Sequence, residues 1–159
     1  MKHVNPIATP LDHAIPILPN PDQNENNQSN PFACIQGELQ YIANAMRPDI
    51  SFAVNRLASH TANPSMQHYS MIKRILRYLL GTRDYGITYH KWGCSKQLIT
   101  YADAAHANAD EKKSTTSIVF LSRGGAILWK SKCQTITALS STKAEYVALA
   151  HAGTEVHWF

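Results

Sequence analysis

The chain has 159 residues, of which 44% are hydrophobic and 16% are charged, and its formal net charge is +4. This length accommodates one domain, or one small domain with part of another, and the hydrophobic content is sufficient for a packed core. The slightly basic balance is compatible with an anionic partner such as nucleic acid, but it is too small to require one.

Cysteine usage and hydropathy indicate the environment of the protein. The three cysteines, Cys34, Cys94 and Cys133, lie far apart and form no CxxC pair. This argues against a disulfide framework and against a structural zinc site. The N-terminal stretch has too many prolines and no unbroken apolar run, unlike a signal peptide. No segment approaches the ~18 apolar residues of a membrane span, so we expect a soluble, intracellular protein.

Residues 1–31 contain most of the prolines and an Asn/Gln-rich patch, NPDQNENNQSN. Such a composition buries too little apolar surface to offset the entropy lost on ordering. We therefore predict an extended lead-in followed by a flexible linker, with no chemical role.

Apolar residues at helical spacing predict a connector of three helices over residues 32–85. Pro48 ends the first helix. Asn63 and Pro64 are predicted to cap and begin the third helix, and Gly81 to end it.

The third helix carries Lys73, Arg74 and Arg77 on its polar face. One interpretation is a solvated helix face. The other is a row of phosphate contacts, which would make nucleic-acid binding weaken with salt. Lys112 and Lys113, in a polar loop, would extend such a surface.

The sequence pattern of residues 86–159 predicts strands followed by a helix. ITYHKW and QLITYAD are predicted as two β segments, and TTSIVFLS and AILWKS as a hairpin around the SRGG turn. That turn lacks the Gly/Lys/Ser spacing of a phosphate-binding P-loop. Trp129 is interpreted as a packed aromatic residue rather than a platform for nucleic-acid bases.

Two carboxylates stand out in this part of the chain. Asp103 closes an apolar strand, on the same side as Ile99 and Tyr101, because strand side chains alternate. Glu145 lies in a helix that opens near residues 140–142. Four apolar residues fall within roughly 60° of Glu145 around the axis, at ~100° per residue: Ala148, Leu149, Ala152 and Val156.

A carboxylate on an apolar stripe costs several kcal/mol unless something compensates it. If this helix packs on the strand, Asp103 and Glu145 converge at one end of the contact. Oxygen ligands without thiolate or imidazole suit Mg²⁺ or Mn²⁺, and paired divalent ions can cut phosphodiesters. The alternative is a buried carboxylate satisfied by hydrogen bonds.

The residues from Tyr101 to Ala150, YADAAHANADEKKSTTSIVFLSRGGAILWKSKCQTITALSSTKAEYVALA, resemble the ribonuclease H domain of copia-type LTR retrotransposon polyproteins. The upstream strings MRPDISFAVNRLASH and NPSMQHYSMIKRILRYLLGTRDYGITY are similar to the segment that joins reverse transcriptase to that domain. Thr9-Pro10-Leu11 matches a short element before the linker. The resemblance covers nearly the whole chain.

The resemblance implies an α+β fold, with a helical connector of reverse transcriptase over residues 32–85. Residues 86–159 would then be an incomplete ribonuclease H-like antiparallel sheet with one long C-terminal helix. It implies metal-dependent cleavage of the RNA strand of an RNA–DNA hybrid, with Asp103 and Glu145 as metal ligands and catalytic residues. Mg²⁺ or Mn²⁺ is the implied cofactor. The remainder of the polyprotein would be a partner, in a cytoplasmic retroelement particle.

Four substitutions depart from the family pattern and are individually tolerable, whereas the family's acids that fall outside the chain argue against activity. Ala105 and His106 stand where the family usually has an acid and a tryptophan, Ser117 stands for a glycine, and Lys143 for a glutamate. In the family, a later strand carries a third metal-binding acid, and a further acid follows it. That strand, the further acid and the paired aspartates of the polymerase all fall outside this chain. We therefore expect weak Mg²⁺ binding and no turnover. The alternatives are a nucleic-acid-binding fragment and a scaffold completed by a partner chain.

Overall fold

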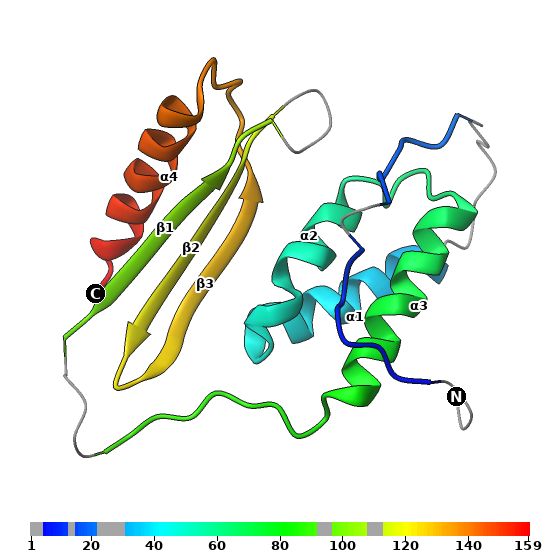
Figure 1. The fold of residues 1–159 in the computed structure, drawn as a ribbon, viewed down its shortest axis with the longest axis horizontal. Helices are drawn as coiled ribbons and strands as arrows, with labels where there is room; N and C mark the ends of the chain where they lie inside the picture. The colour runs from blue at the N-terminus through cyan, green and yellow to red at the C-terminus, as the bar shows by residue number, and fades with distance from the viewer. Residues whose placement is uncertain (1–4, 13–14, 22–30, 92–96, 108–112) are drawn as a thin grey trace. The chain divides into compact units, whose positions relative to one another are not determined.

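The computed structural model describes residues 5–12, 15–21, 31–91, 97–107 and 113–159. Contacts divide the chain into two compact units, Met1–Gly86 and Ile87–Phe159. The first unit is helical, and the second is an open antiparallel sheet with a C-terminal helix (Figure 1). The predicted α+β class is therefore confirmed.

The helical unit contains α1 (Pro31–Ala45), a short 3₁₀ turn (Pro48–Ile50), α2 (Ser51–Ala58) and α3 (Met66–Gly81). Pro48 occupies the first position of the 3₁₀ turn, where its missing N–H costs nothing. The apolar faces of the helices enclose one core, whose fully buried members are Phe32, Leu39, Ala43, Ile50, Ala53, Val54, Leu57, Ile72 and Ile75.

The start of α3 lies two residues later than the sequence predicts. Ser65, not Asn63, is the N-cap: its hydroxyl accepts from the backbone N–H of His68 at 3.4 Å. The imidazole Nδ1 of His68 accepts in return from the backbone N–H of Ser65 at 2.9 Å. This reciprocal capping box satisfies two backbone donors at once and therefore fixes the start of the helix.

The N-terminal segment, residues 5–12 and 15–21, has no helix or strand but lies along α3 in the opposite direction. Leu11 and Ile17 are 8% and 5% exposed and join the helical core, which the composition did not predict. The predicted linker at residues 22–30 lies outside the described residues. Contacts run from one end of α3 to the other, pairing Arg77 with Asn5, Arg74 with Thr9, Gln67 with Pro16 and Asn63 with Asn20.

The second unit has three antiparallel strands, β1 (Ile99–Ala105), β2 (Thr115–Ser122) and β3 (Gly125–Cys133), in the order β1-β2-β3. The predicted hairpin is confirmed: Arg123 and Gly124 have φ values of 52° and 82°, as the tight turns of twisted hairpins require. β1 has no hydrogen-bonded neighbour on its outer side among the described residues.

The prediction of a strand at ITYHKW is wrong for its described part, residues 87–91. The segment meets the end of the β2–β3 hairpin through a hydrogen bond from His90 N–H to the Arg123 carbonyl. The Tyr89 hydroxyl donates to the Ala126 carbonyl at 2.6 Å. The Tyr89 ring fills the space where a Cβ at Gly125 would come within 2.6 Å.

Helix α4 (Ser141–Val156) covers one face of the sheet, chiefly over β1 (Figure 1). Its N-cap is Ser140, whose hydroxyl accepts from the backbone N–H of Lys143. Among the described residues, no helix combines the length and apolar character needed to cross a bilayer. The buried contact with the sheet consists mainly of small residues, namely Ala104, Ala138, Ala144, Ala148 and Ala152, with Ile118 and Phe120.

Candidate functional site

Asp103 lies on the face of β1 that points away from α4. Ala104 is buried against α4, and alternation therefore places Asp103 on the opposite face with Ile99 and Tyr101. Those two residues are 44% and 61% exposed, and Asp103 is exposed as well. The sequence correctly grouped these three side chains, but the side they share is not the buried one.

Glu145 lies beside the buried stripe of α4 rather than on it. The stripe is Ala144, Ala148 and Ala152, whereas Glu145 is exposed and Leu149 is 61% exposed. The prediction that Glu145 lies on a buried apolar stripe, where its carboxylate would be desolvated, is therefore wrong. The helix is rotated so that its smallest side chains face β1, which lets the two backbones approach closely.

A cleft of about 490 Å³ lies between α4 and β1. Glu145 lines it together with the hydroxyl-bearing Ser141 and Thr142, and Tyr146 and Leu149 supply its apolar part. Ala102 of β1 lines the cleft, and Asp103 is not among its lining residues. The cleft therefore combines one carboxylate with exposed apolar surface.

Asp103 extends from the face of β1 that is turned away from α4, whereas Glu145 extends from α4 itself, on the other side of the strand. In the part of the chain that the structure describes, no three or more His, Cys, Asp or Glu side chains are grouped to hold a metal ion. The predicted convergence of Asp103 and Glu145 would therefore give a metal ion at most two carboxylate side chains as ligands.

Two of the three basic side chains on α3 are engaged within the helical unit. Arg77 Nε donates to the Asn5 carbonyl at 2.8 Å. Arg74 Nη2 donates to Thr9 Oγ1 at 2.9 Å, and its Nη1 lies 3.7 Å from an Asp12 carboxylate oxygen. Lys73 is exposed, so this is neither a wholly solvated face nor an open row of cations.

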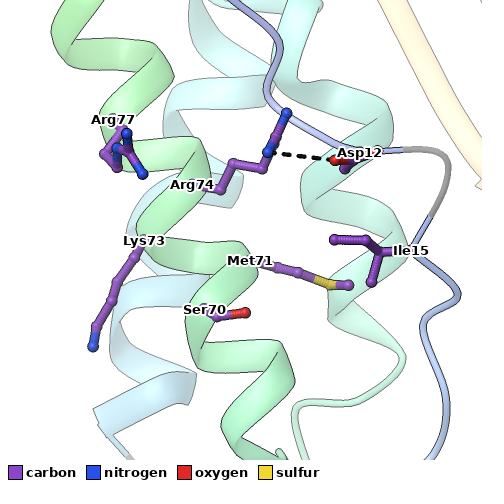
Figure 2. A pocket seen from close by; sticks show the side chains of 7 residues that line it. All are labelled: Asp12, Ile15, Ser70, Met71, Lys73, Arg74 and Arg77. Atoms are coloured by element: carbon purple, nitrogen blue, oxygen red, sulfur yellow. Dashed lines mark ion pairs between the residues drawn. The ribbon is translucent and has the colours of Figure 1, made fainter. Parts of the chain in front are cut away.

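A cleft of about 180 Å³ lies between this face of α3 and the N-terminal segment (Figure 2). Lys73, Arg74 and Arg77 line it from α3, and Asp12 faces Arg74 across it. Of the two loop lysines, Lys113 is partly buried, and Lys112 lies outside the described residues.

The sequence analysis missed a charged cluster around Arg47, which is only 7% exposed. Arg47 binds both carboxylate oxygens of Asp49 and donates to the carbonyl and hydroxyl oxygens of Thr82 at 2.9 and 2.6 Å. The Tyr78 hydroxyl donates to Asp49 at 2.8 Å. The cluster therefore ties the 3₁₀ turn to the end of α3, and the Arg-Pro-Asp string was its available signal.

The cluster shifts the proton affinities of its members. Burial acts to raise the pKa of Asp49, but the hydrogen bonds from Arg47 and Tyr78 outweigh it, and the pKa lies below its ordinary value. Burial and the hydrogen bond to Asp49 raise the pKa of Tyr78. Both shifts favour the charged carboxylate and the neutral phenol, the forms in which the cluster is complete.

Comparisons with known proteins place the chain in a family. It is 36% identical over 164 residues to the retrovirus-related Pol polyprotein from transposon TNT 1-94 of Nicotiana tabacum, covering 99% of this chain and 12% of that protein. It is 42% identical over 125 residues to the Pol polyprotein from transposon RE1 of Arabidopsis thaliana, covering 78% of this chain and 8% of that protein.

A third relative is similar in size to the chain. It is the secreted RxLR effector protein 161 of Plasmopara viticola, which is 37% identical over 129 residues, covering 80% of this chain and 90% of that protein. No protein-family model matches the chain, and no solved structure matches it significantly. The chain belongs to the family of retrovirus-related Pol polyproteins of copia-type transposons, of which it spans about a tenth of the length.

Proposed function

We propose that the second unit is the N-terminal part of a ribonuclease H-like domain. Its parent activity is metal-dependent hydrolysis of the RNA strand of RNA–DNA hybrids, next to a reverse transcriptase whose connector is the helical unit. The observation that carries this proposal is the packing of α4 on β1 through Ala104, Ala144 and Ala148. That contact sets the Glu145 flank of the helix alongside the strand that bears Asp103.

The described residues do not fit a complete site for a pair of divalent ions. A two-metal site clamps both the attacking and the leaving oxygen, and hard cations of this type take six or more oxygen ligands. Asp103, on the face of β1 away from α4, and Glu145, on α4, offer two carboxylates. Ala105, at the exposed end of the strand, offers none. We infer that the chain binds Mg²⁺ or Mn²⁺ weakly and does not catalyse the cleavage of RNA–DNA hybrids on its own.

A fusion tests this function directly. The segment that follows the matched region in the tobacco polyprotein would be joined after Phe159, with Ala105→Asp as a second version. The proposal expects metal-dependent cleavage of a labelled RNA–DNA hybrid, lost in both Asp103→Asn and Glu145→Gln. A folded fusion that binds the hybrid but leaves it intact in both versions would refute the proposal.

A second candidate is a scaffold completed by a separate partner chain. The open outer edge of β1 favours it, because unpaired N–H and C=O groups on an edge strand are a template for another strand. The neighbouring cleft adds Tyr146 and Leu149, which are 69% and 61% exposed. Adding the same tobacco segment as a separate polypeptide distinguishes the two: cleavage restored in trans supports a scaffold, and cleavage seen only in the fusion supports the single-chain parent.

A further inference from the structure

Thr9 stands in a sequence context found nowhere else in the chain. Of the eight prolines, Pro10 alone follows a serine or threonine. Protein kinases of the proline-directed class phosphorylate Ser or Thr followed by Pro in extended segments. Thr9 is exposed and lies outside any helix or strand, so its local conformation suits that class of enzyme.

A cation of α3, Arg74, lies at the position that a phosphate on Thr9 would take. Arg74 Nη2 already donates to Thr9 Oγ1 at 2.9 Å. Arg74 shares its cleft with Lys73, one residue before it, and with Arg77, about one helical turn further on. In Figure 2 the Arg74 side chain extends toward Asp12, whereas the Lys73 side chain extends away from it. An oxygen attached to the Thr9 hydroxyl through phosphorus therefore stays within hydrogen-bonding reach of the Arg74 guanidinium.

We propose that Thr9 is a phosphorylation site whose phosphate is received by Arg74, with Lys73 and Arg77 adding positive charge nearby. The Thr9 hydroxyl oxygen forms a bond to the γ-phosphorus of ATP, the bond from that phosphorus to the β,γ-bridging oxygen breaks, and ADP leaves. The hydroxyl proton passes to the kinase's base. The product carries about −1.5 to −2 charges and three strong acceptor oxygens.

The modification fastens the N-terminal segment to α3. The contact between the charged Arg74 guanidinium and the neutral Thr9 hydroxyl becomes a hydrogen-bonded ion pair, with a charge on both partners. Arg77 holds Asn5 on one side of Thr9, and Leu11 is buried on the other, so the phosphate is anchored between two fixed points. The Asp12 carboxylate, 3.7 Å from Arg74 Nη1, opposes the phosphate and limits the gain.

The experiment treats the full chain with ATP and a proline-directed kinase. Mass spectrometry locates the phosphate, and circular dichroism at 222 nm follows thermal unfolding before and after. Because α4 also contributes at 222 nm, tryptophan fluorescence identifies the transition of the second unit, and the other transition gives the midpoint of the helical unit. We expect phosphate on Thr9, none in Thr9→Ala, and a midpoint raised by about 4 °C or more. The gain disappears in Arg74→Gln. It persists in Arg83→Gln, which removes the same charge from an exposed residue just after α3.

Three outcomes would overturn the proposal. One is a full chain that stays unmodified while a peptide of residues 5–12 is phosphorylated, because the site is then inaccessible in the fold. Another is a phosphorylated chain whose midpoint falls or stays unchanged. The third is an equal gain in the wild type and in Arg74→Gln, which would place the phosphate away from α3.

Discussion

Gln134 holds α4 against the sheet through the backbone of Ala144: its Nε2 donates to the Ala144 carbonyl at 3.0 Å and to Thr116 Oγ1 at 2.9 Å. Gln134 is 1% exposed. The side-chain amide of Gln134 thus links β2 to the first turn of α4. This link fixes the position of Glu145, the residue that follows Ala144.

Replacing Gln134 should destabilise the second unit. In Gln134→Ala, two buried hydrogen bonds are lost and the Thr116 hydroxyl loses a partner, so we expect a loss of about 2–3 kcal/mol in the free energy of unfolding. All three tryptophans lie in this unit, so urea titration followed by tryptophan fluorescence reports it selectively. Gln40→Ala, at a partly exposed position of α1 in the other unit, should leave that transition where it is.

The small residues between α4 and β1 should tolerate no enlargement. Ala148 is 0% exposed, so Ala148→Leu forces the helix away from the strand at a cost of about 1–3 kcal/mol. Leu149→Ala, at the next position but 61% exposed, should change the free energy of unfolding by about 0.5 kcal/mol or less. Equal effects of the two changes would contradict the packing described for α4.

The ion pair between Lys130 and Glu155 should matter little despite its short distance of 2.6 Å. The two side chains are 50% and 24% exposed, and surface pairs are typically worth about 0–1 kcal/mol because water and salt screen them. Lys130→Met should therefore shift the fluorescence-detected transition only slightly, and less still in 0.5 M salt. A salt-independent loss comparable to that of Gln134→Ala would mean that the pair anchors the helix.

The helical unit should lose stability in acid through Asp49. In the folded chain the pKa of Asp49 lies below its ordinary value of 3.8. The stability that the charged carboxylate contributes is therefore complete above pH 3.8, and it is lost as the pH falls from there through the lower pKa of the folded state. The thermal midpoint at 222 nm should fall more steeply below pH 4 in the wild type than in Asp49→Asn. Parallel profiles would show that Arg47 and Tyr78 do not stabilise the charged carboxylate.

The strands and the long helix could be predicted because their patterns are local. Alternation in β2 and β3, the SRGG turn and the Ser140 cap each favour one structure over a short window. The buried face of β1 could not be predicted in the same way. Ile99 and Tyr101 are more hydrophobic than Ala102 and Ala104, yet the approach of α4 requires small residues, and this selects the alanine face.

The rest of the candidate site depended on contacts distant in sequence. Asp103 and Glu145 remain the predicted metal ligands. The exposure of Glu145 follows from the rotation of α4, which the helical period alone does not fix. Likewise, the positive charges at 74 and 77 are visible in the sequence, but their pairing with residues 5–12 crosses more than sixty positions of the chain. Local spacing carries no information about such pairs.

The most direct measurement is cleavage of a labelled RNA–DNA hybrid by the chain in Mg²⁺ or Mn²⁺, compared with the same protein in chelator. Because Asp103 and Glu145 make up only part of a metal site, we predict no cleavage above the chelator control. Metal-dependent cleavage that is lost in Asp103→Asn and in Glu145→Gln, and kept in Asp84→Asn at an exposed position outside the sheet, would contradict the account.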